Sequence, residues 1–594
     1  MKASMGIVPS SAPSPVLFSA KTRAHSLKRL QEETFDLLVI GGGITGAAVA
    51  RDAAMRGLKV ALVEKSDFAF GTSSRSSKLI HGGLRYLEKF EFSLVFEALR
   101  ERTLLLKTVP TLVRPLPFYF PVYRKDRPGK FILGLGMWFY DMLALFRTPG
   151  FHRSLSKRSM LREIPALRAE GLKGGYRYFD ASMWDDVLAI EIARSAQGEG
   201  SAIVNYVEAL EPVWSGGTPE KGAISGFRVK DREPEALGGS PATDFVVKAK
   251  RTVVCLGPYT DLLGPKLSKG WKPRLSPSKG VHLVFDLGRI SVPGAVVMTH
   301  PEDGRIAFVI PRPDYGTGVV IVGTTDGSTG DDPDRAEISS ADVSYLLDLL
   351  NRFFPTLGLK TSDILSGYVG VRPLVASSSG IGADSAALQK VSREHHIEEG
   401  PGGVVWVAGG KYTTHRTMAA EVVDTVLKRW TLRHQEGLAP EGPGLLKEAL
   451  TRKPPSGGLS GVEILEAKIA ALRDGVRVHP RLWERYGAAA PEIVALNTAH
   501  PSISGISDPP GFPFLEAQLR FLMRYGMVMH LSDFYFRRTG LFLSRADHGL
   551  PWLDALSKIW ATERGLGGEA AGRERTRTEG QIVERVAAVP GSKF

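Results

Sequence analysis

The sequence FDLLVIGGGITGAAVARDAAMRGLKVALVEK, residues 35–65, decides the fold class of this chain. It begins with a short apolar run, passes through glycines at 41–46, continues with small residues, and ends after Gly57 in a second apolar run. Short apolar runs bounded by turn residues are typical of buried strands, and the segment between these two has the composition of a helix. The stretch therefore predicts a strand–helix–strand (βαβ) unit of an α/β domain.

Three glycines in the turn, Gly41, Gly43 and Gly46, form the pattern G-x-G-x-x-G directly between strand and helix. The glycines permit a tight turn, close approach of a pyrophosphate and close packing of the helix, whose N-terminus then faces the phosphates. Glu64 ends the second strand, where a carboxylate can bind ribose hydroxyls and would repel a 2'-phosphate. The unit predicts a site for FAD or NAD and excludes NADP.

Outward from this unit, later segments rich in Val, Ile and Phe indicate a mixed α/β body that extends to about residue 430. A stretch rich in Pro and Gly follows, and beyond it the apolar residues have helical spacing, which predicts a second, all-helical domain. The expected organisation is a flexible basic leader (1–34), the body (35–430), a linker (431–462), the helical domain (463–565) and a polar tail (566–594).

Composition is that of a soluble multidomain protein. With 594 residues, 43% apolar and 23% charged, the chain is too long for one core and is neither disordered nor fibrous. A net charge of +13 favours anionic partners, namely nucleic acid, acidic lipid headgroups or a phosphorylated metabolite. The single cysteine, Cys255, excludes an intrachain disulfide and a multi-cysteine metal site, and it favours a reducing compartment.

No stretch has the roughly 18 charge-free apolar residues of a membrane-spanning helix. The nearest is 131–146, FILGLGMWFYDMLALF, which contains Asp141 and is flanked by basic residues. We expect a buried helix there; the alternative is an interfacial anchor whose basic flanks contact lipid headgroups. The leader has the composition of an ordinary flexible tail, which we favour, or of an organellar transit peptide.

A second stretch with chemical character is TSSRSSKLIHGGLRYLE, residues 72–88, which is dense in hydroxyls and cations and has a Gly-Gly pair that lets backbone approach a ligand. We expect His81, Arg85 and Tyr86 to lie beside the glycine turn as ligand-binding residues. The residues expected to contact the cofactor from this stretch are Thr72, Ser73, Ser76, Lys78 and Leu79.

From 35 to 88 the sequence resembles the FAD-dependent glycerol-3-phosphate dehydrogenase family, in the segments IGGGITGAAVARDAAMRG and SSKLIHGGLRYLEKFEFSLVFEAL. The resemblance continues in YFDASMWDD (178–186), KGVHLVFD (279–286), VGTTD (322–326), GYVGVRPL (367–374) and GGKYTTHR (409–416), and in the helical region 519–543. It covers about residues 35–560.

The resemblance implies a flavin fold of the glutathione reductase or amino acid oxidase type, with an antiparallel substrate sheet from about 111–179 and 263–362. It also implies FAD as cofactor and oxidation of sn-glycerol 3-phosphate to dihydroxyacetone phosphate. Electrons would pass to a membrane quinone, which makes the protein peripheral to a membrane. The expected location is the cytoplasmic face in a bacterium, or the mitochondrial inner membrane if the leader is a transit peptide. A homodimer is compatible with the sequence.

The resemblance also implies residue roles. Arg372, Lys411, Arg85 and Tyr86 match substrate-side positions, and we assign the phosphate chiefly to Arg372, whose planar fork suits it. His81 and His282 are the two candidates for the proton acceptor, because histidine titrates nearest neutrality. Alternatively, Lys411 or Arg372 stabilises the developing alkoxide without accepting a proton.

Further candidate residues lie near the end of the body. Gly410 and Thr413 precede a helical run and are expected to place backbone amides at the flavin. Cys255-Leu256-Gly257 follows a strand; Gly257 preserves a turn, and Cys255 is expected to be a small buried hydrophobe rather than a nucleophile. Residues 326–337 fail as a calcium loop because Asp331 replaces the sixth-position glycine, so we predict no metal.

Two rival functions are compatible with these residues. One is the same oxidation with dioxygen as acceptor, an oxidase that makes peroxide. The other is a flavin-containing nucleic-acid-binding protein, which the net charge would suit and which predicts strongly salt-sensitive binding of RNA or DNA. We favour no nucleic-acid partner, because anionic lipids account for the charge equally well.

Overall fold

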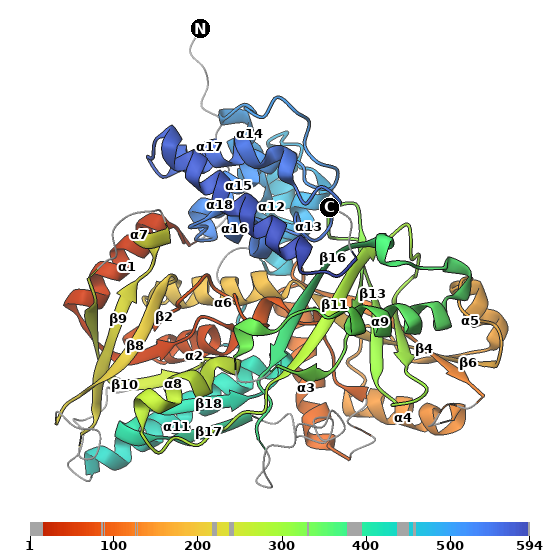
Figure 1. The fold of residues 1–594 in the computed structure, drawn as a ribbon, viewed down its shortest axis with the longest axis horizontal. Helices are drawn as coiled ribbons and strands as arrows, with labels where there is room; N and C mark the ends of the chain where they lie inside the picture. The colour runs from red at the N-terminus through yellow and green to blue at the C-terminus, as the bar shows by residue number, and fades with distance from the viewer. Residues whose placement is uncertain are drawn as a thin grey trace.

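The structure is a computed structural model that describes residues 16–84, 87, 90–124, 126, 129–216, 222–236, 243–329, 332–376, 395–435, 451–455 and 459–591. Two sheets lie beside each other, and a helical C-terminal domain sits over them (Figure 1). The predicted fold class, an α/β dinucleotide-binding domain with a second, largely antiparallel sheet and a C-terminal helical domain, is confirmed.

The first sheet is built on the predicted unit: β1 (Thr34–Ile40), α2 (Ile44–Met55) and β2 (Val60–Val63). Its strand order is β17-β18-β10-β1-β2-β7, and β1 pairs in parallel with both β2 and β10. The other strands are β7 (Ala202–Val204), β10 (Phe245–Val254), β17 (His395–Glu399) and β18 (Val405–Gly409), with the hairpin β8 (Val207–Trp214) and β9 (Ile224–Asp231) joined to β10. β1 lies in the middle of this sheet, and its carboxyl end leads directly into the glycine turn at 41–46.

The second sheet has ten strands, nearly all antiparallel. They are β3 (Leu79–Ile80), β4 (Val113–Tyr123), β5 (Arg153–Leu155), β6 (Leu172–Met183), β11 (Ser278–Asp286), β12 (Ala295–Thr299), β13 (Ile306–Arg312), β14 (Val319–Gly323), β15 (Gly327–Ser328) and β16 (Ile364–Arg372). The sheet thus begins before, and ends beyond, the expected ranges 111–179 and 263–362.

Helices cover both sheets. At the first sheet, α2 packs against both α6 (Asp185–Gly198) and α11 (His415–Gln435). The second sheet is covered by α3 (Phe92–Thr108), α4 (Lys130–Leu143), α5 (Lys157–Glu163) and α9 (Ser340–Phe353). The C-terminal domain contains α12 (Gly461–Arg473), α13 (Pro480–Tyr486), α14 (Ala490–Ala499), α15 (Leu515–Tyr525), α16 (Leu531–Asp533), α17 (Leu553–Glu563) and α18 (Gly568–Ala587).

The prediction of a flexible leader is wrong for residues 20–32, which form α1 (Ala20–Glu32) with a Ser19–Thr22 capping box. Phe18 before it is fully buried and stacks on Phe68 at 5.5 Å between ring centroids. On α1, buried Arg23 pairs with Asp231 at 2.6 Å. These partners are distant in sequence, so the local composition of the leader did not reveal them.

The region expected as a polar tail, 566–594, contains the helix α18 over Gly568–Ala587. Its Glu574 is buried and accepts a hydrogen bond from the Leu531 backbone at 2.6 Å. Beyond the helix, Val589 packs in the apolar core of the second sheet. A few buried side chains are enough to hold a polar helix in place. In this segment they contact both the helical domain and the second sheet.

Buried charges join the helical domain to the first sheet. Asp67 follows β2 and accepts hydrogen bonds from Arg537 at 2.5 Å and from Arg538 at 2.7 and 2.8 Å. Burial alone would raise the pKa of Asp67, but Arg538 and Arg537 hold it down at about 2. Removing one member would leave a buried charge without its partner, so the two domains are held in a fixed relation.

Candidate active site

A cavity of about 430 Å³ lies between the carboxyl end of β1 and the second sheet. Segments from both sheets form its wall, and most of the predicted site residues lie on it. The predicted residues on the wall are Gly41, Gly43, Glu64, Thr72, Ser73, Ser76, Leu79, His81, Gly257, His282, Arg372, Gly410, Lys411 and Thr413. Arg85 and Tyr86 lie outside the described residues.

The glycine turn has the geometry that its sequence requires. Gly41 has φ +108°, and a Cβ there would meet the Cys255 carbonyl oxygen at 2.5 Å; a Cβ on Gly46 would meet the Gly41 oxygen at 1.9 Å. Gly46 thus packs α2 against the turn and does not itself line the cavity. Gly43, in contrast, has an ordinary negative φ of −74°, so its backbone does not require glycine. The missing side chain instead leaves room in the cavity in front of it. Burial raises the pKa of the Cys255 thiol, as expected for a small hydrophobe.

The residues around the turn suit a dinucleotide. The first backbone amide of α2, that of Ile44, lies at the cavity and donates to Ser73 Oγ at 2.9 Å. Glu64 accepts hydrogen bonds from the Gly42 and Ser66 amides at 2.7 and 2.8 Å, which leaves lone pairs for ribose hydroxyls. Burial raises the pKa of Glu64 despite these two hydrogen bonds. The donor and acceptor set fits the pyrophosphate and ribose of FAD.

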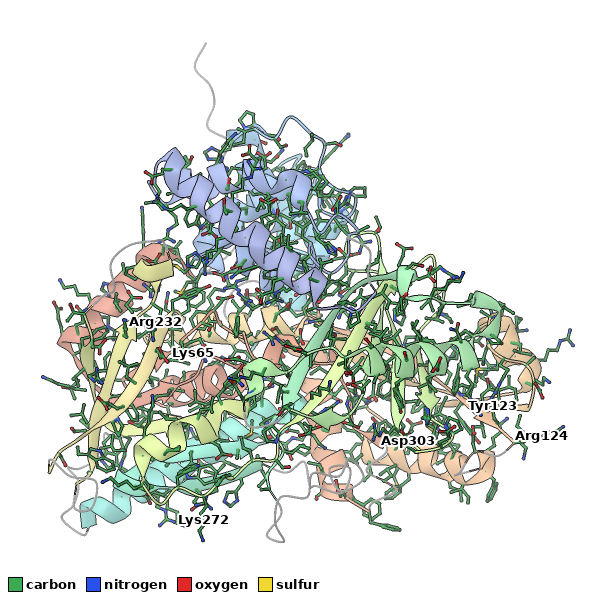
Figure 2. The ribbon with its side chains drawn as sticks, viewed as in Figure 1. Lys65, Tyr123, Arg124, Arg232, Lys272 and Asp303 are labelled. Atoms are coloured by element: carbon green, nitrogen blue, oxygen red, sulfur yellow. The ribbon has the colours of Figure 1, made fainter. Side chains whose placement is uncertain are left out.

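Tyr259 and Lys65, which lie at this end of the cavity, were not predicted from the sequence. Both residues line the cavity beside Glu64. Figure 2 labels Lys65, just past the end of β2. Neither residue stands in a recognisable motif, so only the tertiary structure places them at the ribose end.

Arg372 and His282 lie on the opposite wall, at the end of β16 and in the middle of β11. Arg372 pairs with Asp326 at 2.5 Å and donates to Thr324 Oγ1 at 2.9 Å. His282 shares a hydrogen bond with Ser77 Oγ at 2.9 Å. The pairing of β11 with β16 thus brings two residues far apart in the chain to one cavity.

Two glycines in the strands make room for these side chains. A Cβ on Gly280 would lie 2.5 Å from Arg372 Nη2, and a Cβ on Gly323 would lie 2.4 Å from His282 Cδ2. Both glycines were missed by the sequence analysis. The signal was present, because glycine within an apolar strand often marks a close approach of another group.

The segment that carries His81 is held from behind by a buried network. The Gly82 amide donates to Tyr140 Oη at 2.9 Å, and the Tyr140 hydroxyl donates to Asp180 at 2.9 Å. Arg102 pairs with the same carboxylate at 2.5 Å. His81 therefore lines the cavity from a braced backbone.

Lys78 does not line the cavity, contrary to its predicted place among the cofactor contacts. Its ammonium is fully buried and pairs with Asp185 at 2.5 Å. Burial would lower the pKa of Lys78, but attraction by Asp185 and Asp186 raises it overall. Lys78 therefore braces α6 against the segment 72–79.

Two buried histidines predict how stability depends on pH. Burial lowers the pKa of His282 to about 3 and that of His415 to about 4. The unfolded chain takes up protons on these rings below about pH 6.5 while the folded chain does not, so stability falls as pH falls from 6.5 toward 4. The expected loss is up to about 1.4 kcal/mol per pH unit for each histidine.

Urea unfolding at pH 7.5 and 5.5 measures this loss. Replacement of His415, which does not line the cavity, with Gln should reduce the pH dependence. Replacement of exposed His25 with Gln is the matched control and should leave it unchanged. Equal stability of the wild type at the two pH values would contradict the prediction.

Comparison with known proteins agrees with this geometry. Residues 36–424 match the FAD dependent oxidoreductase family, and residues 459–570 match the C-terminal domain of alpha-glycerophosphate oxidase. An aerobic glycerol-3-phosphate dehydrogenase of Staphylococcus aureus strain USA300 is 34% identical over 544 residues, which cover 91% of this chain and 92% of the relative.

The chain belongs to the FAD-dependent glycerol-3-phosphate dehydrogenase family. The resemblance stated from the sequence is thereby confirmed. The crystal structure of a glycerol-3-phosphate dehydrogenase from Bacillus halodurans complexed with FAD is similar to this fold, with a TM-score of 0.74 at 27% identity, covering 95% of this chain and 97% of that one. This member of the family is an FAD-dependent oxidoreductase, and FAD is its cofactor.

Proposed function

We propose that this protein oxidises sn-glycerol 3-phosphate to dihydroxyacetone phosphate and passes the electrons to a membrane quinone. The observation that carries the proposal is one cavity in which a dinucleotide turn faces Arg372, Lys411 and two histidines. FAD, when bound, supplies the acceptor for the hydride that leaves the carbinol carbon. The residues of the chain must then bind the phosphate, orient the carbinol and take the hydroxyl proton.

The phosphate is assigned to Arg372 with Lys411. A guanidinium has five donors in a fixed fork, which suits a phosphate dianion, and Lys411 adds a second cation from the segment that follows β18. The Asp326 carboxylate, 2.5 Å from Arg372 Nη1, orients the guanidinium. Because Gly280 has no side chain, the guanidinium has room to lie beside it.

We assign to His81 the role of the base that accepts the hydroxyl proton of the substrate. It lies on the cavity wall with a partly exposed side chain, on the segment braced through Gly82. Burial and the nearby charge of Arg372 lower the pKa of His282 to about 3, so His282 is a weak base at neutral pH. A general base works best with a pKa near the operating pH. We therefore assign His282 to positioning through its hydrogen bond with Ser77.

The proposal is tested by adding glycerol 3-phosphate anaerobically to the purified yellow protein. Bleaching of the oxidised flavin band is expected. A flavin band that stays unchanged in FAD-loaded protein would overturn the assigned substrate. Adding a soluble quinone or dioxygen to the reduced protein then separates the two acceptors, because an oxidase would release peroxide in proportion to substrate.

Arg372→Ala is expected to raise the KM for glycerol 3-phosphate by roughly 10- to 150-fold, because a charge-assisted contact of about 1.5–3 kcal/mol is lost. FAD content should stay at the wild-type level. Arg289→Ala is the matched control: Arg289 also pairs with an aspartate, Asp363, at 2.9 Å, but does not line the cavity. An unchanged KM in Arg372→Ala would remove this residue from the phosphate site.

Membrane contact is assigned to α4. The expectation of a buried helix is wrong for one face: Leu133, Met137 and Tyr140 are buried, whereas a row of large apolar side chains is exposed. Such a patch on a protein surface marks an interaction site. The exposed residues of this row and its surroundings are Phe90, Phe131, Ile132, Leu135, Trp138, Met142, Leu145, Phe146 and Phe151.

The place of α4 suits a lipid surface. It lies along the edge of the molecule opposite the helical domain (Figure 1), and Arg124, labelled in Figure 2, projects at the same side. In the part of the chain that the structure describes, no helix is long and apolar enough to cross a membrane. We place the protein at the cytoplasmic face of a bacterial membrane, where the apolar row would enter the headgroup region.

The double variant Phe131→Glu, Leu135→Glu is expected to bind anionic lipid vesicles with an affinity lower by roughly 100-fold or more, because two large apolar side chains are no longer buried in the lipid. Co-sedimentation with the vesicles measures this affinity. Anaerobic bleaching by glycerol 3-phosphate should persist. Ile503→Glu, a change at an exposed apolar residue of the helical domain, is the control. Vesicle binding by the double variant equal to that of the wild type would contradict the assignment.

We assign the contact between the two copies of a homodimer to α12. The small residues of this helix are buried, and its large aliphatic residues are exposed. A surface helix ordinarily turns its large apolar residues toward the core. A second copy of this chain would cover the exposed stripe, and sedimentation equilibrium in a non-ionic detergent should then give twice the chain mass of 64.5 kDa. A monomer would contradict the assignment. The buried residues are Ala467, Ala470 and Ala471, and the exposed ones are Val462, Leu465, Ile469 and Leu472.

A further inference from the structure

The cavity reaches the surface of the molecule at its ribose end. Lys65 and Tyr259 line the cavity there, yet the Lys65 side chain is 42% exposed. Asp334, which contacts both of them, is 48% exposed and does not line the cavity. The three side chains therefore stand where the cavity meets solvent.

Contacts among these three side chains join the two sheets. Lys65 follows β2, and Tyr259 ends a short helix, η3 (Gly257–Tyr259), that follows β10; both strands belong to the first sheet. Asp334 lies in η4 (Pro333–Arg335), between β15 and α9 at the second sheet. Contacts between them therefore join the first sheet to the second beside the cavity.

The link consists of three contacts. The Tyr259 hydroxyl donates to Asp334 Oδ1 at 2.7 Å. Lys65 Nζ lies 4.8 Å from the centroid of the Tyr259 ring and 3.6 Å from the Asp334 carboxylate. Hydrogen bonds to an ionised carboxylate are among the stronger ones, whereas an exposed ion pair contributes little. The contact between Tyr259 and Asp334 is thus the main one, and Lys65 assists it.

Both ends of the link are held in place. The Asp334 amide donates to Asp332 Oδ1 at 2.9 Å, which caps η4. A Cβ on Gly71 would lie 3.4 Å from Tyr259 Cε2, so the Tyr259 ring packs on the segment that leads into Thr72. Burial and the Asp334 carboxylate raise the pKa of Tyr259, so its hydroxyl keeps its proton and stays a donor at neutral pH.

We propose that Lys65, Tyr259 and Asp334 form a latch that retains FAD by closing the cavity over its ADP half. FAD leaves only while the hydrogen bond between Tyr259 and Asp334 is broken. The inference rests on FAD as the cofactor and on its pyrophosphate lying at the glycine turn, and it does not depend on the proposed substrate or electron acceptor.

The test is the rate at which FAD leaves the loaded, full-length protein. The flavin fluorescence that appears on release is followed after dilution into an excess of a flavin-binding trap. Tyr259→Phe keeps the ring and removes the hydroxyl, and it should raise the release rate roughly 10-fold or more. Tyr345→Phe is the matched control: its hydroxyl also donates to an aspartate, Asp303, at 3.2 Å, but it does not line the cavity.

A double-variant cycle shows whether the two residues act through each other. Asp334→Ala removes the acceptor and should raise the release rate by a similar factor, and Tyr259→Phe with Asp334→Ala should release FAD no faster than Asp334→Ala alone, because the contact between Tyr259 and Asp334 is lost only once. Release at the wild-type rate in Tyr259→Phe would overturn the latch. Effects that multiply in the double variant would also overturn it, since Tyr259 and Asp334 would then act on FAD independently.

Discussion

Gly43→Val should give a folded protein that contains no FAD. Gly43 has φ −74°, which valine adopts without strain, so the substitution does not act through the backbone. Its Cβ would lie 3.1 Å from Ser73 Oγ, the acceptor of the Ile44 amide, and the remaining methyl groups would occupy the space that the pyrophosphate needs. Loss of the cofactor removes all oxidation of glycerol 3-phosphate.

The measurement is the flavin absorbance per mole of purified protein, together with the change in melting temperature on adding FAD. The variant should show no flavin band and no shift. Gly136→Ala is the control, because nothing lies within 4 Å of a Cβ at that position. Gly46→Val differs, because its Cβ would meet backbone at 1.9 Å, and it should fail to fold. A fully flavinated Gly43→Val protein would refute the placement of the pyrophosphate.

His81→Asn should slow the anaerobic bleaching of the flavin by about 10²- to 10⁴-fold, the usual contribution of a general base. Asparagine keeps a polar side chain of similar size but cannot take the hydroxyl proton at neutral pH. The bound FAD and the KM for glycerol 3-phosphate should change little, because the phosphate is assigned to Arg372 and Lys411.

The pH dependence separates His81 from a merely structural residue. The wild-type rate should fall on the acidic side as the base is protonated, and this limb should be absent in His81→Asn. His282→Asn is the matched comparison, and since His282 is already neutral it should retain the acidic limb. A severe loss in His282→Asn with a mild one in His81→Asn would reverse the two assignments.

The dinucleotide site was predictable because its parts are local. The glycine turn, the first turn of α2 and Glu64 lie within residues 41–64, so the pattern can be recognised from neighbours along the chain. The positive φ of Gly41 and the close packing of Gly46 are requirements of a single turn. The resemblance to a family added the far wall of the cavity, which no local pattern indicates.

Contacts between distant segments were not predictable from local patterns. Gly280 within an apolar strand signals a close approach, but only the structure shows that Arg372 is the group that lies against it, and Tyr259 reaches the cavity without belonging to a motif. Lys78 looked like a cofactor contact in the sequence, but Asp185, 107 positions away, pairs with its charge.

The two ends of the chain show the same limit. Residues 20–32 and 568–587 are polar enough to look unstructured, and both are helices. Each is held by a few buried side chains whose partners lie elsewhere in the chain, such as Asp231 for Arg23. Composition measures how many apolar residues a segment has, and it does not show what the polar ones will contact.

By itself, the sequence determined the βαβ unit, the dinucleotide site and the family, since these depend on neighbours along the chain and on short motifs. Only the tertiary structure decided which face of α4 and of α12 is exposed. Apolar spacing shows that a helix has an apolar stripe, but the energy of burial depends on what packs against it. In α12 small alanines take the inner side, and the large aliphatic residues are left for another surface.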